Sequence, residues 1–277
     1  MIDKLKKIYS FYKEIISSRG IILKLAKNDF RTKYASSYLG TVWAFIQPLV
    51  IIVMYFLVFQ FGLRTATTFT TSTGNFPYVL WLICGIIPWF YFSEAMITGA
   101  NSLVDYSYLV KKMVFKISIL PVVKITSSFF THIFFIFFIF FMFFIFKHNP
   151  NMYNIQFLYY SLCMYLLVAG ISLFTSSILV FFKDMGQIIT ILMNIGFWAT
   201  PIIWSTDRLA KHPFLGIIFE MNPMYYIVQG YRDTFMNGIW FWNRGFSTLY
   251  FWAFTIFFLI VGQRTFKNLK PHFSDVL

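Results

Sequence analysis

Residues 101–124 read NSLVDYSYLVKKMVFKISILPVVK, and this stretch organises the rest of the chain. It is a short basic interruption between two long apolar runs, and it holds four lysines against a single acid, Asp105. In a membrane protein, a short lysine-rich loop of this kind marks the cytoplasmic side. The stretch therefore predicts the orientation of the apolar segments that precede and follow it.

The same stretch has the spacing of a short amphipathic helix. Its apolar residues can form one stripe while the lysines face elsewhere, which is typical of a helix at the membrane surface. The stripe consists of Leu109, Val110, Met113 and Val114. Two interpretations are open: a loop that only sets topology, or a segment that passes force from a cytoplasmic partner to the membrane helices.

The composition of the whole chain is that of a polytopic membrane protein. Of its 277 residues, 58% are hydrophobic and only 12% are charged, whereas a soluble domain has about 25% charged residues. The net charge of +13 lies mostly beside apolar runs, which indicates membrane topology and lipid headgroups rather than nucleic acid as a partner. Two cysteines inside apolar runs and four scattered histidines predict neither a disulfide nor a metal site.

Six apolar segments predict six membrane-spanning helices, because each approaches or exceeds the length needed to cross a bilayer core of about 30 Å. They cover 41–63, 77–100, 117–146, 155–182, 187–204 and 246–262. The expected fold is therefore an all-α polytopic membrane protein. Of the 23 Lys and Arg residues, 17 lie in the segments that this layout places inside, which predicts that both termini are cytoplasmic.

Four segments are expected to do something other than span the membrane. Residues 1–38 form two basic amphipathic helices, broken near Ser18, which predicts a position in the membrane interface; a partner-binding helix or simple anchor is the alternative. The extracellular segment 205–244 is too polar to span as one helix, so short re-entrant helices are expected. Within the six-span domain 39–265, the loop 101–117 is cytoplasmic, and residues 266–277 form a cytoplasmic tail.

The second predicted span carries a lone acid, Glu94. A charge at mid-membrane costs on the order of 3 kcal/mol on insertion scales. Glu94 is therefore expected to face other protein, a watery path or the cytoplasmic interface, and its closeness to Asn101 favours the interface.

No pattern of catalytic residues is evident. No glycine is followed by lysine, which excludes a GxxxxGK[ST] phosphate loop, and neither HExxH nor GxSxG occurs. The chain is therefore predicted not to be an enzyme and to carry no cofactor. Two functional classes are open for such a chain: an ATP-independent channel or carrier, and a membrane transferase. A transferase needs catalytic side chains, but the acids Asp207, Glu220 and Asp233 have no catalytic spacing.

A series of short motifs occurs in a defined order along nearly the whole chain. They are Tyr38-Leu39-Gly40 with Trp43 and Pro48, Trp89-Phe90-Tyr91-Phe92, Asn101-Ser102-Leu103, Leu109-Val110-Lys111-Lys112, Ile119-Leu120-Pro121, Lys183-Asp184-Met185, Thr200-Pro201-Ile202-Ile203-Trp204, Asn222-Pro223 and Tyr231-Arg232-Asp233. Together they resemble the membrane permease subunits of ABC-type exporters for polysaccharides and teichoic acids. The ending 272–277 and the run 58–64 look most like teichoic acid permeases. Phe115-Lys116 departs from the family's usual Phe-Pro.

The resemblance implies a homodimer in the bacterial cytoplasmic membrane, with ATP and Mg²⁺ bound by two copies of a separate ATP-binding cassette subunit. The implied cargo is a lipid-linked polymer, with teichoic acid as the first interpretation and O-antigen or capsular polysaccharide as the alternative. The loop 101–117 would contact the ATPase as a coupling helix. Its implied contact residues are Asp105, Leu109, Val110, Lys111, Lys112 and Phe115.

The resemblance also implies a channel lined by aromatic rings, which suits sugars because their C–H faces stack on Trp and Tyr. The expected path residues are Tyr38, Trp43, Trp89, Tyr91, Trp198, Trp204, Tyr225, Tyr226 and Arg232. Each aromatic could instead belong to the ordinary interfacial belt. Arg232 would meet a phosphate-bearing group, or alternatively form a surface pair with Asp233 or Glu220.

Overall fold

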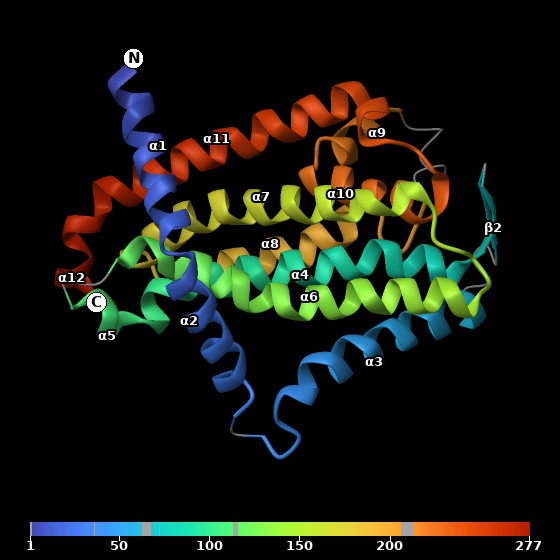
Figure 1. Cartoon of the computed structure of the whole chain (residues 1–277), viewed down its shortest axis with the longest axis horizontal. Helices are drawn as coiled ribbons and strands as arrows, with labels where there is room; N and C mark the ends of the chain where they lie inside the picture. The colour runs from blue at the N-terminus through green and yellow to red at the C-terminus, as the bar shows by residue number, and fades with distance from the viewer. Residues whose placement is uncertain (1, 36, 63–67, 72, 113–115, 206–212) are drawn as a thin grey trace.

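Long helices run side by side along the long axis of the molecule, and two N-terminal helices cross them near one end (Figure 1). The computed structural model describes residues 2–35, 37–62, 68–71, 73–112, 116–205 and 213–277. In that part of the chain, five helical segments are long and apolar enough to cross a membrane: Gly40–Gly62, Tyr78–Asp105, Ile117–Ile145, Met152–Leu179 and Phe241–Val276. With one shorter apolar helix, they confirm the predicted polytopic membrane protein.

These segments and their connections have the following bounds. The crossing segments consist of η1 (Gly40–Val42), α3 (Trp43–Leu57) and η2 (Val58–Gly62); α4 (Tyr78–Asp105); η3 (Ile117–Ile119) and α6 (Leu120–Ile145); η4 (Met152–Ile155) and α7 (Gln156–Leu179); η7 (Phe241–Arg244), α11 (Gly245–Leu269), η8 (Lys270–His272) and α12 (Phe273–Val276). The other elements are α1 (Ile2–Ser17), α2 (Arg19–Thr32), β1 (Thr68–Thr71), β2 (Gly74–Pro77), α5 (Ser107–Val110), α8 (Met185–Ala199), α9 (Pro213–Glu220), α10 (Pro223–Arg232) and η6 (Asp233–Asn237).

The predicted fifth span, 187–204, is shorter in the structure than in the sequence analysis. Its helix α8 has 15 residues, which reach about 22 Å at 1.5 Å per residue, less than the bilayer core of about 30 Å. Pro201 explains the early end, because proline disfavours helical backbone in the residue before it. Thr200 accordingly has extended backbone, with φ −95° and ψ 132°.

α4 forms the centre of the bundle, whereas α3 lies at its edge. In the most apolar stretch of 18 residues, 78% of the residues are buried in α4, but only 11% are buried in the segment Gly40–Gly62 that contains α3. Small residues let neighbouring helices approach closely. A Cβ added at Gly99 would lie 2.5 Å from Ser172 Oγ on α7, and one at Gly170 would lie 2.8 Å from the Leu259 backbone nitrogen on α11.

The N-terminal segment forms two helices with a break at Ser18, as the sequence predicted. They cross the bundle near the end that carries α5 and α12 (Figure 1). α2 packs on α6, and the Tyr12 hydroxyl of α1 donates a hydrogen bond to the Leu259 carbonyl at 2.6 Å. Tyr9 and Ile16 of α1 stay exposed.

The predicted segment 205–244 folds into short helices at the other end of the bundle, although residues 206–212 lie outside the described chain. Asn222 caps the start of α10, since its Oδ1 accepts a hydrogen bond from the Met224 backbone nitrogen at 2.9 Å. Its Nδ2 donates to Thr200 Oγ1 at 2.8 Å, which ties α10 to the end of α8. An antiparallel hairpin of β1 and β2, which the sequence analysis did not predict, also lies at this end.

The predicted tail 266–277 is packed against the bundle. α11 continues to Leu269, beyond the predicted span end at 262, and η8 and α12 follow it. Phe273 is fully buried, and its ring centroid lies 5.5 Å from that of Phe266. Val110 of α5 belongs to the same apolar cluster, so the tail and the α5 segment are held together.

Candidate functional site

A groove of about 590 Å³ opens between α3, α4 and α8. Its lining residues are Ala44, Gln47, Pro48, Ile51 and Tyr55 from α3; Trp89, Phe90, Ser93 and Glu94 from α4; Met193, Asn194, Phe197 and Trp198 from α8; and Lys33 and Tyr34. The wall therefore combines aromatic rings with amide, hydroxyl and charged groups. Such a surface can stack on the apolar faces of sugars and hydrogen-bond their hydroxyl groups.

Local sequence explains the shape of this groove. Gly196 lets α8 approach α4, because a Cβ at this position would lie 2.9 Å from Cη2 of Trp89. Pro48 has no backbone N–H, so the carbonyl four residues earlier, at Ala44, loses its helical donor and adds an acceptor to the wall. The rings of Tyr55 and Phe197 stack at 5.5 Å across the groove between α3 and α8.

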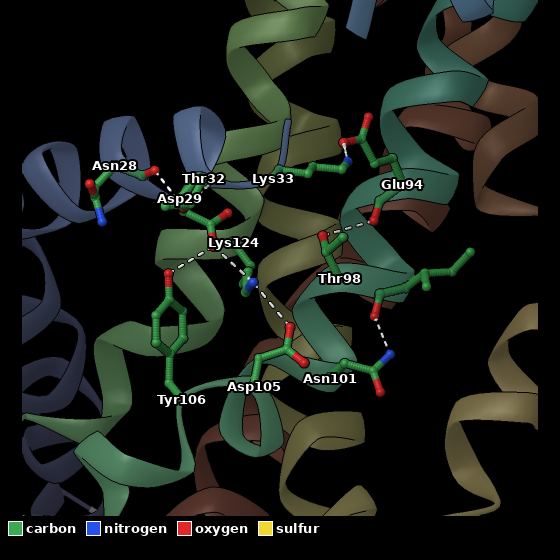
Figure 2. Close-up of polar contacts among 11 residues, drawn as sticks. Asn28, Asp29, Thr32, Lys33, Glu94, Thr98, Asn101, Asp105, Tyr106 and Lys124 are labelled. Carbon is green, nitrogen blue, oxygen red and sulfur yellow. Dashed lines mark hydrogen bonds and ion pairs between the residues drawn. The ribbon is translucent and has the colours of Figure 1, made fainter. Parts of the chain in front are cut away.

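An ion pair between Lys33 and Glu94 lies at the end of the groove nearest the N-terminal helices (Figure 2). Lys33 follows the last residue of α2, whereas Glu94 projects from α4. Burial alone would lower the pKa of Lys33, but the Glu94 carboxylate and Tyr34 outweigh it and raise the pKa above its ordinary value. The lone acid of the second span thus faces a cation of the same chain.

A second polar cluster centres on Lys124 of α6 (Figure 2). Its Nζ lies 2.8 Å from Asp29 Oδ1 and 3.0 Å from Asp105 Oδ2. The Tyr106 hydroxyl donates to Asp29 Oδ1 at 2.7 Å, and Nζ of Lys124 lies 4.9 Å from the centroid of the Tyr106 ring. Burial and the Asp29 carboxylate raise the pKa of Tyr106, which keeps its hydroxyl a donor. The cluster joins α2, α6 and the end of α4.

The last turn of α2 connects the cluster to the groove. Asp29 and Lys33 are four residues apart, a spacing that places two side chains on the same face of a helical turn. One of them binds Lys124, and the other binds Glu94. A polar pocket of about 320 Å³ lies between the two ion pairs, with Thr98, Ser127 and Ser128 among its lining residues. Movement of α2 therefore changes the contacts of both sites together.

The segment that follows Asp105 presents a mixed surface. Val110 is buried and anchors α5, and Leu109 is half-buried against the same apolar cluster. Lys111 and Lys112 are exposed, as is Tyr108, whose ring the sequence analysis did not single out. Phe115 lies outside the described residues, as do positions 113 and 114. The structure therefore leaves the second half of the predicted stripe unplaced.

The model of the ABC-2 type transporter family matches residues 22–236. The chain belongs to this family. An O-antigen export system permease protein RfbA from Klebsiella pneumoniae is 24% identical over 260 residues, which cover 93% of this chain and 95% of the relative. A protein of the same name from Myxococcus xanthus is 22% identical over 223 residues, which cover 80% of this chain and 83% of the relative. The chain is therefore a membrane permease and not an enzyme, and ABC-2 permeases work with an ATP-binding subunit.

Of the predicted path residues, two line the groove between α3, α4 and α8, namely Trp89 and Trp198. Trp204 lies next to it, because its indole nitrogen donates to the Trp198 carbonyl at 3.1 Å. Tyr38 and Trp43 precede or begin α3, outside the groove lining, and both are exposed.

Three predicted path aromatics lie elsewhere in the permease. Tyr91 is buried on α4, and its ring centroid is 5.0 Å from that of His132. Tyr226 is buried on α10 and stacks on Phe251 at 4.9 Å. Tyr225, beside it on α10, is half-buried. These rings pack within the subunit, so their part in transport stays a prediction.

Arg232 is also inside the subunit rather than on its surface. Its guanidinium carbon lies 3.5 Å from the centroid of the Trp81 ring, and Nη2 donates to the Ile202 carbonyl at 2.9 Å. The expected alternative, a surface pair with Asp233 or Glu220, is wrong, since Arg232 is 3% exposed and Asp233 instead forms an ion pair with Arg244. Arg232 therefore ties α10 to α4 and to the turn after α8.

The sequence analysis did not single out Asp29 or Lys33 and did not foresee the partners of Lys124. The one signal was Glu94, since an acid in an apolar span needs a partner. Its partner Lys33 is 61 residues away along the chain, and no spacing rule links such positions.

Proposed function

We propose that the permease exports a lipid-linked cell-surface polysaccharide across the bacterial cytoplasmic membrane, with both termini in the cytoplasm. It acts as a homodimer with two copies of a separate ATP-binding cassette subunit, which bind the ATP and Mg²⁺. The observation that carries this proposal is the groove on an ABC-2 permease, with Trp89 and Trp198 in its wall and an ion pair at one end. Its size and mixed lining suit a sugar chain.

An O-antigen type of polysaccharide is the cargo that the comparisons support better than teichoic acid. Both relatives described above carry the name O-antigen export system permease, and one aligns over 95% of its own length. The resemblance to teichoic acid permeases rests on the ending 272–277 and the run 58–64. These are short stretches, and part of the second lies outside the described residues. We therefore take the polysaccharide as first choice and teichoic acid as the alternative.

The exposed faces of α3 and α8 support the homodimer. Val50, Val53 and Met54 are exposed on α3, and Ile191 and Ile195 are exposed on α8, so both helices present apolar faces that lipid or a second copy can cover. A groove that opens between these two helices becomes an enclosed path when a second copy covers it. Enclosure is needed because a polar polymer cannot cross the hydrocarbon core without a lined passage.

The polar cluster supports a route for coupling. Closure of the ATPase subunits moves the exposed surface of α5, and Asp105 at the adjoining end of α4 carries that movement to Lys124 and Asp29. The last turn of α2 shifts as a result. Lys33 then separates from Glu94, and the inner end of the groove opens to the polymer.

Depletion of the permease in its native host tests this function. The expected result is loss of one surface polymer, together with accumulation of its lipid-linked form inside the cell. Sugar and phosphate analysis of the accumulated material then separates a polysaccharide from a polyol-phosphate chain. Normal surface polymers with no accumulated intermediate would contradict export by this permease, while ion or small-solute leakage would favour the channel alternative.

A further inference from the structure

A second groove, of about 490 Å³, lies between the N-terminal helices and the bundle, and the proposed transport path does not use it. α1 and α2 form one wall, and α6, α7 and α11 form the other. Its lining residues are Tyr12, Ile15, Ile16, Arg19, Ile22, Leu23, Val122, Thr126, Tyr165, Leu166, Ala169, Leu173 and Leu259. This volume falls in the range of about 300–1,000 Å³ that is typical of ligand sites.

The interior of this groove is apolar in effect, although three hydroxyl groups line it. The Tyr12 hydroxyl is occupied by the Leu259 carbonyl at 2.6 Å. The hydroxyl groups of Thr126 and Tyr165 bond each other at 2.8 Å. Since all three hydroxyl groups already have hydrogen-bond partners, the groove offers little to a polar ligand. A hydrocarbon chain fills such a space at no cost in lost hydrogen bonds.

The mouth of the groove combines apolar and cationic groups. Ile16 and Leu23 are 68% and 53% exposed at its rim. Arg19 begins α2 between them, and among the side chains that the structure describes it has no ion-pair partner. Arg19 is therefore free to bind an anion from outside the chain. A lipid phosphate is the anion found beside an apolar groove at the membrane interface.

We propose that this groove binds one anionic phospholipid of the adjacent leaflet, with an acyl chain in the groove and its phosphate on Arg19. In the proposed orientation that leaflet is the cytoplasmic one, where anionic headgroups collect at basic pockets between membrane helices. The bound lipid acts as a structural ligand that holds α1 and α2 against the bundle. The proposal does not depend on which polymer the permease exports.

Two variants separate the headgroup contact from the acyl-chain contact. Arg19→Glu reverses the charge at the mouth without filling the groove. Ala169→Phe adds a ring to a lining position that is 8% exposed. Ile16→Trp is a second blocking variant, and because Ile16 is mostly exposed this change leaves the packed interior intact. Lys24→Glu is the matched control, since Lys24 is an exposed cation on α2 outside the groove lining.

The experiment uses the full chain reconstituted in vesicles of equal parts phosphatidylglycerol and phosphatidylcholine. Native mass spectrometry then counts the lipids that survive gentle extraction. We expect one retained phosphatidylglycerol per chain in the wild type and in Lys24→Glu. Arg19→Glu should lower the preference over phosphatidylcholine by about tenfold, and Ala169→Phe and Ile16→Trp should abolish retention.

Three results would overturn the proposal. One is equal retention of the two phospholipids by the wild type. Another is unchanged retention by both blocking variants when their thermal unfolding matches the wild type. The third comes from protein purified from native membranes: if the retained lipid is a polyprenyl phosphate instead of a phospholipid, the groove holds the cargo carrier.

Discussion

Replacing Lys124 with methionine tests whether the polar cluster transmits movement or only stabilises the fold. Lys124 is 14% exposed and is the shared partner of Asp29 and Asp105. Removing one partner of a buried ion pair costs about 3–5 kcal/mol. Asp29 keeps the Tyr106 hydroxyl, and Asp105 is 45% exposed and can be hydrated, so we expect the lower end, about 3 kcal/mol.

The double variant Asp29→Asn with Lys124→Met separates the two roles. It removes the unpaired buried carboxylate, so at least about 1 kcal/mol of the lost free energy of unfolding should return. The cation that links α2 to Asp105 is still missing, so we expect the double variant to hydrolyse ATP without exporting polymer. Lys112→Met, at an exposed position, is the control for stability and should change it by no more than about 0.5 kcal/mol.

The assays are reversible unfolding in mixed micelles, and ATP hydrolysis and polymer export by the complex in vesicles. If export returns in the double variant in step with stability, the cluster is structural and the coupling route is refuted. Export that stays low while stability recovers supports transmission through Lys124.

Three further outcomes follow from the same structure. Lys112→Glu should weaken association with the ATPase in a pull-down assay, while Lys183→Glu, a cation in a different short turn, should leave it unchanged. Trp198→Ala should lower the rate of export by between about twofold and tenfold, because one aromatic contact in the groove is lost. Trp242→Ala should leave the rate of export unchanged, because Trp242 is comparably exposed but lies outside the groove lining. Gly170→Leu should lower the thermal unfolding temperature and reduce the free energy of unfolding by about 1–3 kcal/mol, because the backbone of α11 already occupies the space beside Gly170. An unchanged unfolding temperature would show that α7 and α11 can separate at this point.

The sequence predicted the features that depend on local composition. The apolar segments, the break at Ser18 and the basic stretch after Asp105 all follow from residue type and period, and the structure contains each of them. The early end of α8 could also have been found from Pro201, because the rule for the residue before proline is local. The π-helices η2 and η6 and the hairpin of β1 and β2 carried no comparable signal.

The features that depend on contacts between distant residues could not be predicted. Lys33 and Glu94, or Tyr106 and Asp29, are separated by 61 and 77 positions, and only the packing of α2 against the bundle brings them together. Arg232 illustrates the same limit. Beside Asp233 it looks like a surface residue, but α10 turns it toward Trp81 inside the core. Periodicity assigns a face to a helix, not the neighbour that will cover it.

We propose that this chain is the membrane half of an ATP-driven exporter. The most direct test is gentle purification from native membranes, with every co-purifying chain identified and its ratio to the permease counted. We predict an ATP-binding subunit with a phosphate loop, in a one-to-one ratio with the permease. Reproducible absence of any ATPase, with the permease intact and folded, would contradict ATP-driven export and leave an ATP-independent channel or carrier as the better explanation.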